Sequence, residues 1–231
     1  MLELFPHGFE EIEHPDGIEL AAYTDPAGEE RLWEVFGSAE GRDVAAGWED
    51  AWRRFHRPVR VGPLWVGPPW AEPDADAIPI VIDPGRAFGT GSHATTRLCL
   101  ALIETQPRGS LLDVGCGSGV LAIAAAKLGF SPVTAVDVED SAVEATRANA
   151  AENGVELEVW RADATSEELP DTDVAVANIS LAAVEGVVPR LGAGEVITSG
   201  YLESDRLVLP GRHARARRTE GGWAAEVWAR D

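Results

Sequence analysis

The sequence predicts an α/β protein in which a mostly parallel β-sheet is covered by helices on both faces. Two observations support this class. From residue 111 onward, short apolar and β-branched runs alternate with Ala-rich runs of helical composition, and this alternation is typical of parallel sheets. In addition, residues 111–137 read as strand, glycine loop, helix and strand. That is the βαβ unit, which joins two parallel strands.

The βαβ unit also predicts a ligand. Its first strand, 111–114, ends at the glycine loop GCGSG at 115–119; helix 120–128 follows, and strand 133–136 closes on Asp137. Glycines let a ligand approach the backbone closely, and a helix N-terminus offers unpaired N–H groups. An acid about 20 residues after such a loop can accept hydrogen bonds from two ribose hydroxyls. We therefore expect a nucleoside-containing ligand.

The spacing of the glycines narrows the choice of ligand. The dinucleotide fingerprint is G-x-G-x-x-G, whereas here G-x-G-x-G is followed by Val120 and Leu121, which makes NAD a poorer match. The segment DVGCGSG instead resembles the first motif of S-adenosylmethionine-dependent methyltransferases, in which Asp137 would be the ribose-binding acid. A glycine motif alone is also compatible with a simple tight turn.

Further elements follow from the same patterns. We expect strands at 80–83, 156–161, 173–178 and 195–199, helices at 96–104, 141–153 and 181–191, and a closing hairpin of 213–219 and 223–229. Thr95 or Ser92 is the expected N-cap of the first of these helices, and Ser141 that of the second.

The N-terminal part differs in texture from this α/β region. Residues 10–23 predict a β-hairpin, and residues 29–36 and 47–54 predict short helices. The sequence therefore predicts a small α+β domain over 1–56, a linker over 57–79 and the α/β domain over 80–231.

Charge and cysteine content limit the class of partner and the compartment. The 231 residues include 19 Lys and Arg against 39 Asp and Glu, a net charge of −20. This balance argues against direct nucleic-acid binding and fits a basic partner, although acidity can also serve solubility alone. Two cysteines cannot build a disulfide framework, so a cytoplasmic location is expected. We expect no membrane span, because no apolar run approaches about 18 residues, and no metal site, because the five histidines show no ligand spacing.

Three of the predicted strand ends carry polar or glycine residues. Gly115, Asp137 and Asn178 each end or follow a strand of the parallel sheet, and ligands of such sheets bind beyond the carboxyl ends of the strands. Asn178 could hold an amine by its hydrogens and direct its lone pair. The alternative is that Asn178 serves as the N-cap of the following helix.

A resemblance to a known family becomes specific when several segments are taken together. VIDPGRAFGTGSHATTRLCL, DVGCGSGVLAIAAAKLG, AVDV and VANI, in this order and spacing, resemble the ribosomal protein methyltransferases of the PrmA family, which modify the eleventh protein of the large ribosomal subunit. The resemblance covers about residues 30–231. It implies a doubly wound, seven-stranded methyltransferase domain behind a small ferredoxin-like recognition domain, with S-adenosyl-L-methionine as cofactor and a basic ribosomal protein as substrate.

The resemblance also implies which residues bind the cofactor. These are Thr96, Gly115, Gly117, Asp137 and Asn178, with Phe88, Gly89 and Thr90 lining the methionine side. The family's recognition domain begins with a further strand and helix, so we expect the small domain of this chain to be incomplete. An open sheet edge would result, compatible with a monomer or a swapped dimer.

The implied reaction is methylation of lysine side-chain or N-terminal α-amines, with nucleophile, methyl carbon and sulfur held in line. We expect Asn178 to orient the amine, and we identify no dedicated general base. His93 is a candidate base by residue type, but its position in a glycine loop favours a structural role. Two alternatives remain: a methyltransferase for another substrate, such as a small molecule or another protein, and a cofactor-binding module without substrate recognition.

Overall fold

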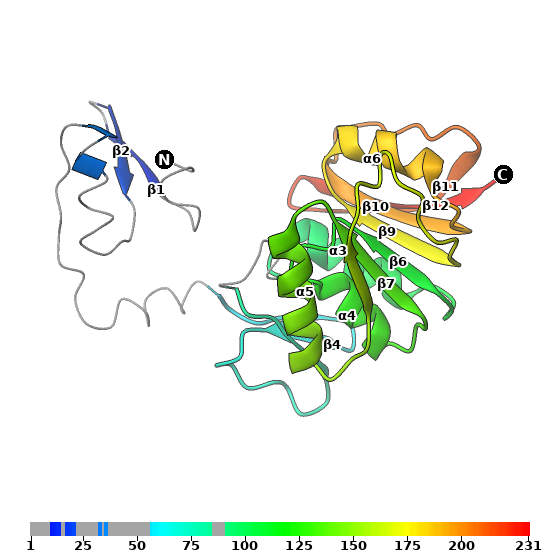
Figure 1. Ribbon diagram of the computed structural model, residues 1–231, viewed down its shortest axis with the longest axis horizontal. Coiled ribbons are helices and arrows are strands. Elements are labelled where there is room, and N and C mark those ends of the chain that lie inside the picture. Colours follow the sequence, from blue (N-terminus) through cyan, green and yellow to red (C-terminus); the bar gives the residue numbers. More distant parts are fainter. Residues whose placement is uncertain (1–9, 15–16, 22–31, 34, 37–55, 85–90) are drawn as a thin grey trace. The chain divides into compact units, whose positions relative to one another are not determined.

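The computed structural model describes residues 10–14, 17–21, 32–33, 35–36, 56–84 and 91–231. The chain divides into two compact units, Met1–Asp50 and Ala51–Asp231 (Figure 1). No helix within the described residues is both long enough and apolar enough to cross a bilayer.

The first unit contains a β-hairpin. Strands β1 (Glu10–His14) and β2 (Gly17–Ala21) pair antiparallel, with His14 opposite Gly17. The hairpin predicted for residues 10–23 is therefore confirmed. Residues 32–33 and 35–36 are helical, within the helix predicted at 29–36, whereas the helix predicted at 47–54 lies outside the described residues.

The second unit is the α/β part of the chain. Its elements in chain order are β3 (Val59–Val61), β4 (Leu64–Gly67), β5 (Ile78–Val81), α3 (Ala94–Glu104), β6 (Leu111–Val114), α4 (Val120–Lys127), β7 (Val133–Asp137), α5 (Asp140–Glu152), β8 (Glu158–Arg161), β9 (Val174–Asn178), α6 (Leu181–Val187), the 3₁₀ helix η1 (Val188–Arg190), β10 (Glu195–Leu202), β11 (Arg212–Glu220) and β12 (Trp223–Arg230).

Seven of these strands form one sheet in the order β11-β12-β10-β9-β6-β7-β8. Strand β12 runs antiparallel to its neighbours β10 and β11, and the other pairs are parallel (Figure 1). The predicted doubly wound, mostly parallel sheet is confirmed. Strands β6, β7 and β8 are added one after another toward one edge of the sheet, whereas β9 lies on the other side of β6. The order of strands thus reverses between β6 and β9, and open α/β sheets bind ligands at such a switch point.

The sheet separates two apolar cores. Within strand β6, Leu111 belongs to the core formed with α3 and α4, whereas Leu112 and Val114 belong to the core formed with α6 and η1. This alternation follows from the two-residue period of a strand. Because both faces of the strand are buried, the run reads as continuously apolar in the sequence, apart from Asp113.

A second, three-stranded sheet precedes α3. Its order is β3-β4-β5, and Leu64, Val66 and Ile80 are buried in the core that also holds α3 and α4. The side chain of Asn153, at the end of α5, holds the backbone of β5 by two hydrogen bonds. The Val81 N–H donates to Asn153 Oδ1 (2.9 Å), and Asn153 Nδ2 donates to the Val81 carbonyl (2.7 Å). The segment expected as a linker, 57–79, thus contains strands of the second unit, and the domain boundaries remain a prediction.

Several strand and helix ends differ from the sequence predictions. The strand expected at 80–83 lies two residues earlier, at Ile78–Val81. Helix α5 begins at Asp140 with Glu139 as N-cap, so the Ser141 cap is wrong by two residues. The Glu139 N–H donates to Asp137 Oδ1 at 3.1 Å, which turns the chain directly after β7. The helix expected at 181–191 becomes α6 and η1, because a proline in the second removes a backbone donor.

The N-cap of α3 also differs from the prediction, since it is His93 and neither Thr95 nor Ser92. Its Nδ1 accepts from the Thr95 N–H at 3.4 Å and lies 2.8 Å from Thr95 Oγ1. The imidazole ring also packs edge-on against Trp223, with ring centroids 4.9 Å apart. These contacts give His93 the structural role that its loop position favours.

Candidate functional site

The glycine loop turns the chain from β6 into α4. Gly115, Gly117 and Gly119 have φ of 73°, 54° and 81°, a left-handed region that side-chain-bearing residues rarely adopt. The N–H groups of Gly115 and Cys116 both donate to the Val136 carbonyl, at 2.9 and 3.1 Å. The alternating glycines of the motif are thus explained by the backbone conformation of the loop, which is tied to the neighbouring strand β7.

Asp137 lies at the end of β7 beside this loop. Its Oδ2 accepts the Gly117 N–H at 3.0 Å and its Oδ1 accepts the Glu139 N–H at 3.1 Å. Two backbone donors therefore fix the carboxylate plane. Each carboxylate oxygen keeps acceptor capacity for a further hydrogen bond, so the group can accept from two hydroxyls of a ligand.

Asn178 ends β9, the strand on the other side of β6. Ser180, not Asn178, is the N-cap of α6, since its hydroxyl accepts the Ala183 N–H at 3.4 Å. The interpretation of Asn178 as a helix cap is therefore wrong. The Asn178 side chain makes no hydrogen bond within the described part of the chain, and the residue is partly exposed. Its amide is available to a ligand at the carboxyl edge of the sheet.

Asp113 was not among the residues singled out from the sequence. It is 1% exposed; its Oδ2 accepts the Ala122 N–H in the first turn of α4 at 3.1 Å, and its Oδ1 has no partner in the described residues. Burial, together with the charge of Asp137, raises the pKa of Asp113 to about 7 against the opposing hydrogen bond from Ala122. The signal in the sequence was an acid inside the apolar run LLDV, directly before the glycines.

The remaining candidate residues lie on the segment before and within α3. Thr96 is 2% exposed in the first turn of α3, and this helix begins near the start of β12, at the same edge of the sheet. No hydrogen bond of the described residues joins Thr96 to Gly115, Asp137 or Asn178. Phe88, Gly89 and Thr90 lie outside the described residues.

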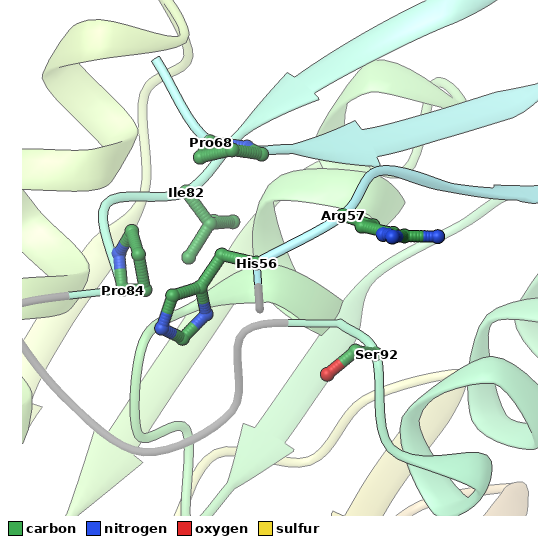
Figure 2. Close-up of a pocket in the computed structure, with 6 residues that line it drawn as sticks. All are labelled: His56, Arg57, Pro68, Ile82, Pro84 and Ser92. Atoms are coloured by element: carbon green, nitrogen blue, oxygen red, sulfur yellow. The ribbon is translucent and has the colours of Figure 1, made fainter. Parts of the chain in front are cut away.

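Two cavities lie elsewhere in the second unit. One, of about 10 Å³, is lined by His56, Arg57, Pro68, Ile82, Pro84 and Ser92, which Figure 2 shows converging from the segments around β3, β5 and the start of α3. It has room for about one water molecule. The other, an open groove of about 570 Å³, is lined by residues that include Arg60, Arg97 and Arg218. Gly115, Asp137 and Asn178 line neither cavity.

The residues at the carboxyl edge fit a nucleoside cofactor. The fixed Asp137 carboxylate supplies acceptors for ribose hydroxyls, the glycines of the loop leave backbone accessible, and the buried Asp113 Oδ1 is an acceptor without a donor among the described residues. Buried acceptors of this kind are satisfied by water or a ligand. Within the described residues, no three His, Cys, Asp or Glu side chains gather as a metal ion would require.

Comparison with known proteins also points to a methyltransferase family. The sequence model of the family described as ribosomal protein L11 methyltransferase (PrmA) matches residues 37–229. A ribosomal protein L11 methyltransferase of Symbiobacterium thermophilum is 39% identical over 189 residues, which cover 80% of this chain and 62% of the relative. One of Laribacter hongkongensis is 47% identical over 158 residues, covering 67% of this chain and 51% of the relative.

A solved structure supports the fold. The crystal structure of a ribosomal protein L11 methylase from Lactobacillus delbrueckii subsp. bulgaricus aligns with a TM-score of 0.66 and 29% identity, covering 76% of this chain and 100% of that one. By contrast, the match to the two curated relatives named above covers less than two thirds of their own length. The family match nevertheless extends over most of the chain, from residue 37 to residue 229, and so the chain belongs to the ribosomal protein L11 methyltransferase (PrmA) family.

Proposed function

We propose that this protein is an S-adenosylmethionine-dependent methyltransferase that methylates lysine side-chain or N-terminal α-amines of a large-subunit ribosomal protein. One observation carries the proposal beyond family membership. Asp137 and Asn178 end the two strands that flank β6, so that they lie on either side of Gly115 at the switch point of the sheet. One residue accepts hydrogen bonds from a ribose and the other accepts them from an amine.

The cofactor side of the site is formed by β6 and β7. The Asp137 carboxylate accepts hydrogen bonds from the two ribose hydroxyls, because backbone N–H groups hold it in a fixed plane. Gly115 and Gly117 expose the backbone of the loop to the ligand. By the family resemblance, Thr96 is a further cofactor contact, and Phe88, Gly89 and Thr90 line the methionine side. When bound, S-adenosylmethionine supplies a methyl group on a positively charged sulfur.

The substrate side is formed by the end of β9. The Asn178 carbonyl oxygen accepts an N–H of the incoming amine and so directs the nitrogen lone pair toward the methyl carbon. A lysine amine has an ordinary pKa of about 10.4, so it must lose a proton before it attacks. Desolvation at the edge of the sheet lowers that pKa, which allows transfer without a dedicated protein base.

The proposed substrate class rests on the relatives and on charge. The relatives carry the printed name ribosomal protein L11 methyltransferase, and a net charge of −20 attracts a basic protein partner at long range. The excess of acidic over basic residues also disfavours direct binding to the phosphate backbone of a nucleic acid.

The test incubates this protein and S-adenosylmethionine with purified ribosomal protein L11 and, separately, with an extract of total cell protein, followed by intact-mass analysis of ribosomal protein L11. Addition of methyl groups to that protein alone, out of an extract of total cell protein, is the expected result. Methylation of a different molecule would contradict the proposed substrate and support the proposed methyl-transfer reaction. Binding of the donor without transfer to any substrate would favour the non-catalytic binding module, and absence of donor binding would contradict the proposal as a whole.

A further inference from the structure

Strand β10 contains a bulge at the level of the proposed site. It pairs in parallel with β9 as far as Ser199 opposite Asn178, and its antiparallel pairing with β12 shifts register between Ser199 and Tyr201. Gly200, the residue between them, has φ of +97°. A bulge of this kind re-aims the strand next to a site, and here it lies beside the last residue of β9.

The backbone of Gly200 touches the backbone of Ile179. A Cβ atom at Gly200 would lie within 2.6 Å of the Ile179 carbonyl carbon and closer still to its oxygen, and 3.1 Å from its nitrogen. These are main-chain atoms, so a rotamer change cannot relieve the overlap. The segment that follows β9 can hold its place only because residue 200 has no side chain.

Ile179 meets a second glycine on its other side. A Cβ atom at Gly115 would overlap the Cγ2 atom of Ile179. Ile179 therefore lies between the loop proposed to hold the methyl donor and the bulge of β10. The two glycines together fix the separation between that loop and the end of β9.

Asn178 depends on this arrangement for its orientation. Its amide makes no hydrogen bond within the described residues, so main-chain position is what directs it. Ser180 caps α6 immediately afterwards, which fixes the chain on the far side of Ile179. A shift of Ile179 would therefore be transmitted to Asn178 and not absorbed in a flexible loop.

We propose that Gly200 is a positioning residue for the methyl transfer: the missing side chain at the β10 bulge seats Ile179 and thereby sets where Asn178 presents the amine to the donor. This inference rests on the proposed function. It concerns a residue outside the proposed donor and amine sites, and it acts through Ile179, whose main chain contacts Gly200 and whose side chain contacts Gly115.

The experiment compares Gly200→Ala with Gly129→Ala. Gly129 has φ of +96°, almost identical to that of Gly200, but a Cβ atom there has nothing within 4 Å. Both variants place a side chain at nearly the same positive φ, and only Gly200→Ala carries the overlap with Ile179. Turnover at saturating donor and substrate, donor affinity by calorimetry and melting temperature are measured for both variants.

We expect Gly200→Ala to lower kcat by roughly 10²-fold, the effect of misplacing a reacting group by about 1 Å, with donor affinity changed less than about threefold. Gly129→Ala should keep wild-type kcat. The double variant Gly200→Ala/Asn178→Ala should be no slower than Asn178→Ala alone, because both changes remove the same interaction. Additive losses, or equal losses of kcat in the two glycine variants, would overturn the inference.

A second variant covers failure of Gly200→Ala to fold. Ile179→Ala removes the contact with Gly115 without introducing an overlap, and the same loss of kcat, retention of donor affinity and non-additivity with Asn178→Ala are expected. Full kcat in Ile179→Ala would contradict the positioning role. Absence of methyl transfer in the wild-type protein would instead contradict the proposed function, so the two failures are distinguishable.

Discussion

At the scale of single residues, Asp113 and Asn178 depart most clearly from what packing alone requires. Within the part of the chain that the structure describes, one oxygen of the buried Asp113 carboxyl group has no partner, and the Asn178 amide at the end of β9 makes no hydrogen bond. A buried polar atom without a partner destabilises a fold. Both residues lie at the carboxyl edge of the sheet, where a ligand can supply the partner.

Asp113 predicts a pH dependence of stability. Its carboxyl group ionises near pH 4 in the unfolded chain and near pH 7 when folded. Between these values the folded state binds one more proton, so raising the pH favours unfolding, by at most about 1.4 kcal/mol per pH unit. Denaturant unfolding of wild type and Asp113→Asn between about pH 4 and pH 8 should show the stability of wild type falling relative to the variant. A difference that stays constant with pH would contradict the raised pKa.

Asn178 predicts a separation of turnover from binding. Asn178→Ala should lower kcat by roughly 10²-fold because the amine loses its orientation, while donor affinity by calorimetry changes little. Ser180→Ala, which removes the neighbouring helix cap, is the control and should cost about 1 kcal/mol of stability. Unchanged turnover in Asn178→Ala would rule out the orienting role.

At the scale of elements, an ion pair that is mostly shielded from solvent links the two strands of the closing hairpin. Arg217 of β11 donates to Glu226 Oε1 of β12 at 2.8 Å, and Tyr201 of β10 donates its hydroxyl to Oε2 of the same carboxylate at 3.0 Å. Glu226 is 5% exposed. Together with Tyr201, the pair connects the edge strand β11 through β12 to β10, the strand that carries the Gly200 bulge.

The hairpin predicts unequal effects of two arginines on one strand. Arg217→Ala leaves the buried Glu226 carboxylate without its cation and should lower the free energy of unfolding by about 2 kcal/mol, which is below the usual range for a fully buried pair because the arginine is partly exposed. Arg215→Ala removes an exposed partner of Glu195 and should cost less than about 1 kcal/mol. Equal losses in urea unfolding would show that Glu226 is not shielded as the structure indicates.

Elements also show how far the sequence can be interpreted. The order of strands, loops and helices in the α/β region was predictable, because the spacing of apolar residues, the Ala-rich runs and the positions of the glycines all indicate the same elements. The cap of α3 was not, since His93 acts through a side chain that is not a usual cap. The bulge at Gly200 could not be predicted either, because it depends on Ile179 lying against it, and those two residues meet only after β9 and β10 pair.

At the scale of the whole molecule, charge is distributed unevenly along the chain. Residues 1–50 contain 14 of the 39 acidic residues and only two of the 19 basic ones. A field of this sign accelerates association with a basic protein and repels anions. The small first unit is accordingly the more acidic part of the chain for its length.

This charge predicts a salt dependence that separates substrate from cofactor. Raising the ionic strength from about 0.01 M to about 0.15 M shortens the Debye length from about 30 Å to about 8 Å. Therefore kcat/KM for a basic ribosomal protein should fall, while donor affinity, set by short-range hydrogen bonds, should change little. A kcat/KM that is insensitive to salt would show that the acidic residues do not guide the substrate.

The central claim is that the carboxyl edge holds an adenosyl donor through Asp137. Calorimetric titration of S-adenosylmethionine into wild type, Asp137→Asn and Asp140→Asn tests it most directly, since Asp140 is an exposed acid three residues away whose side chain is 82% accessible. We expect wild-type affinity in Asp140→Asn and affinity weakened by about 10- to 100-fold in Asp137→Asn, the loss of charge-assisted hydrogen bonds. No binding to folded wild-type protein, or equal affinity in Asp137→Asn, would contradict the account.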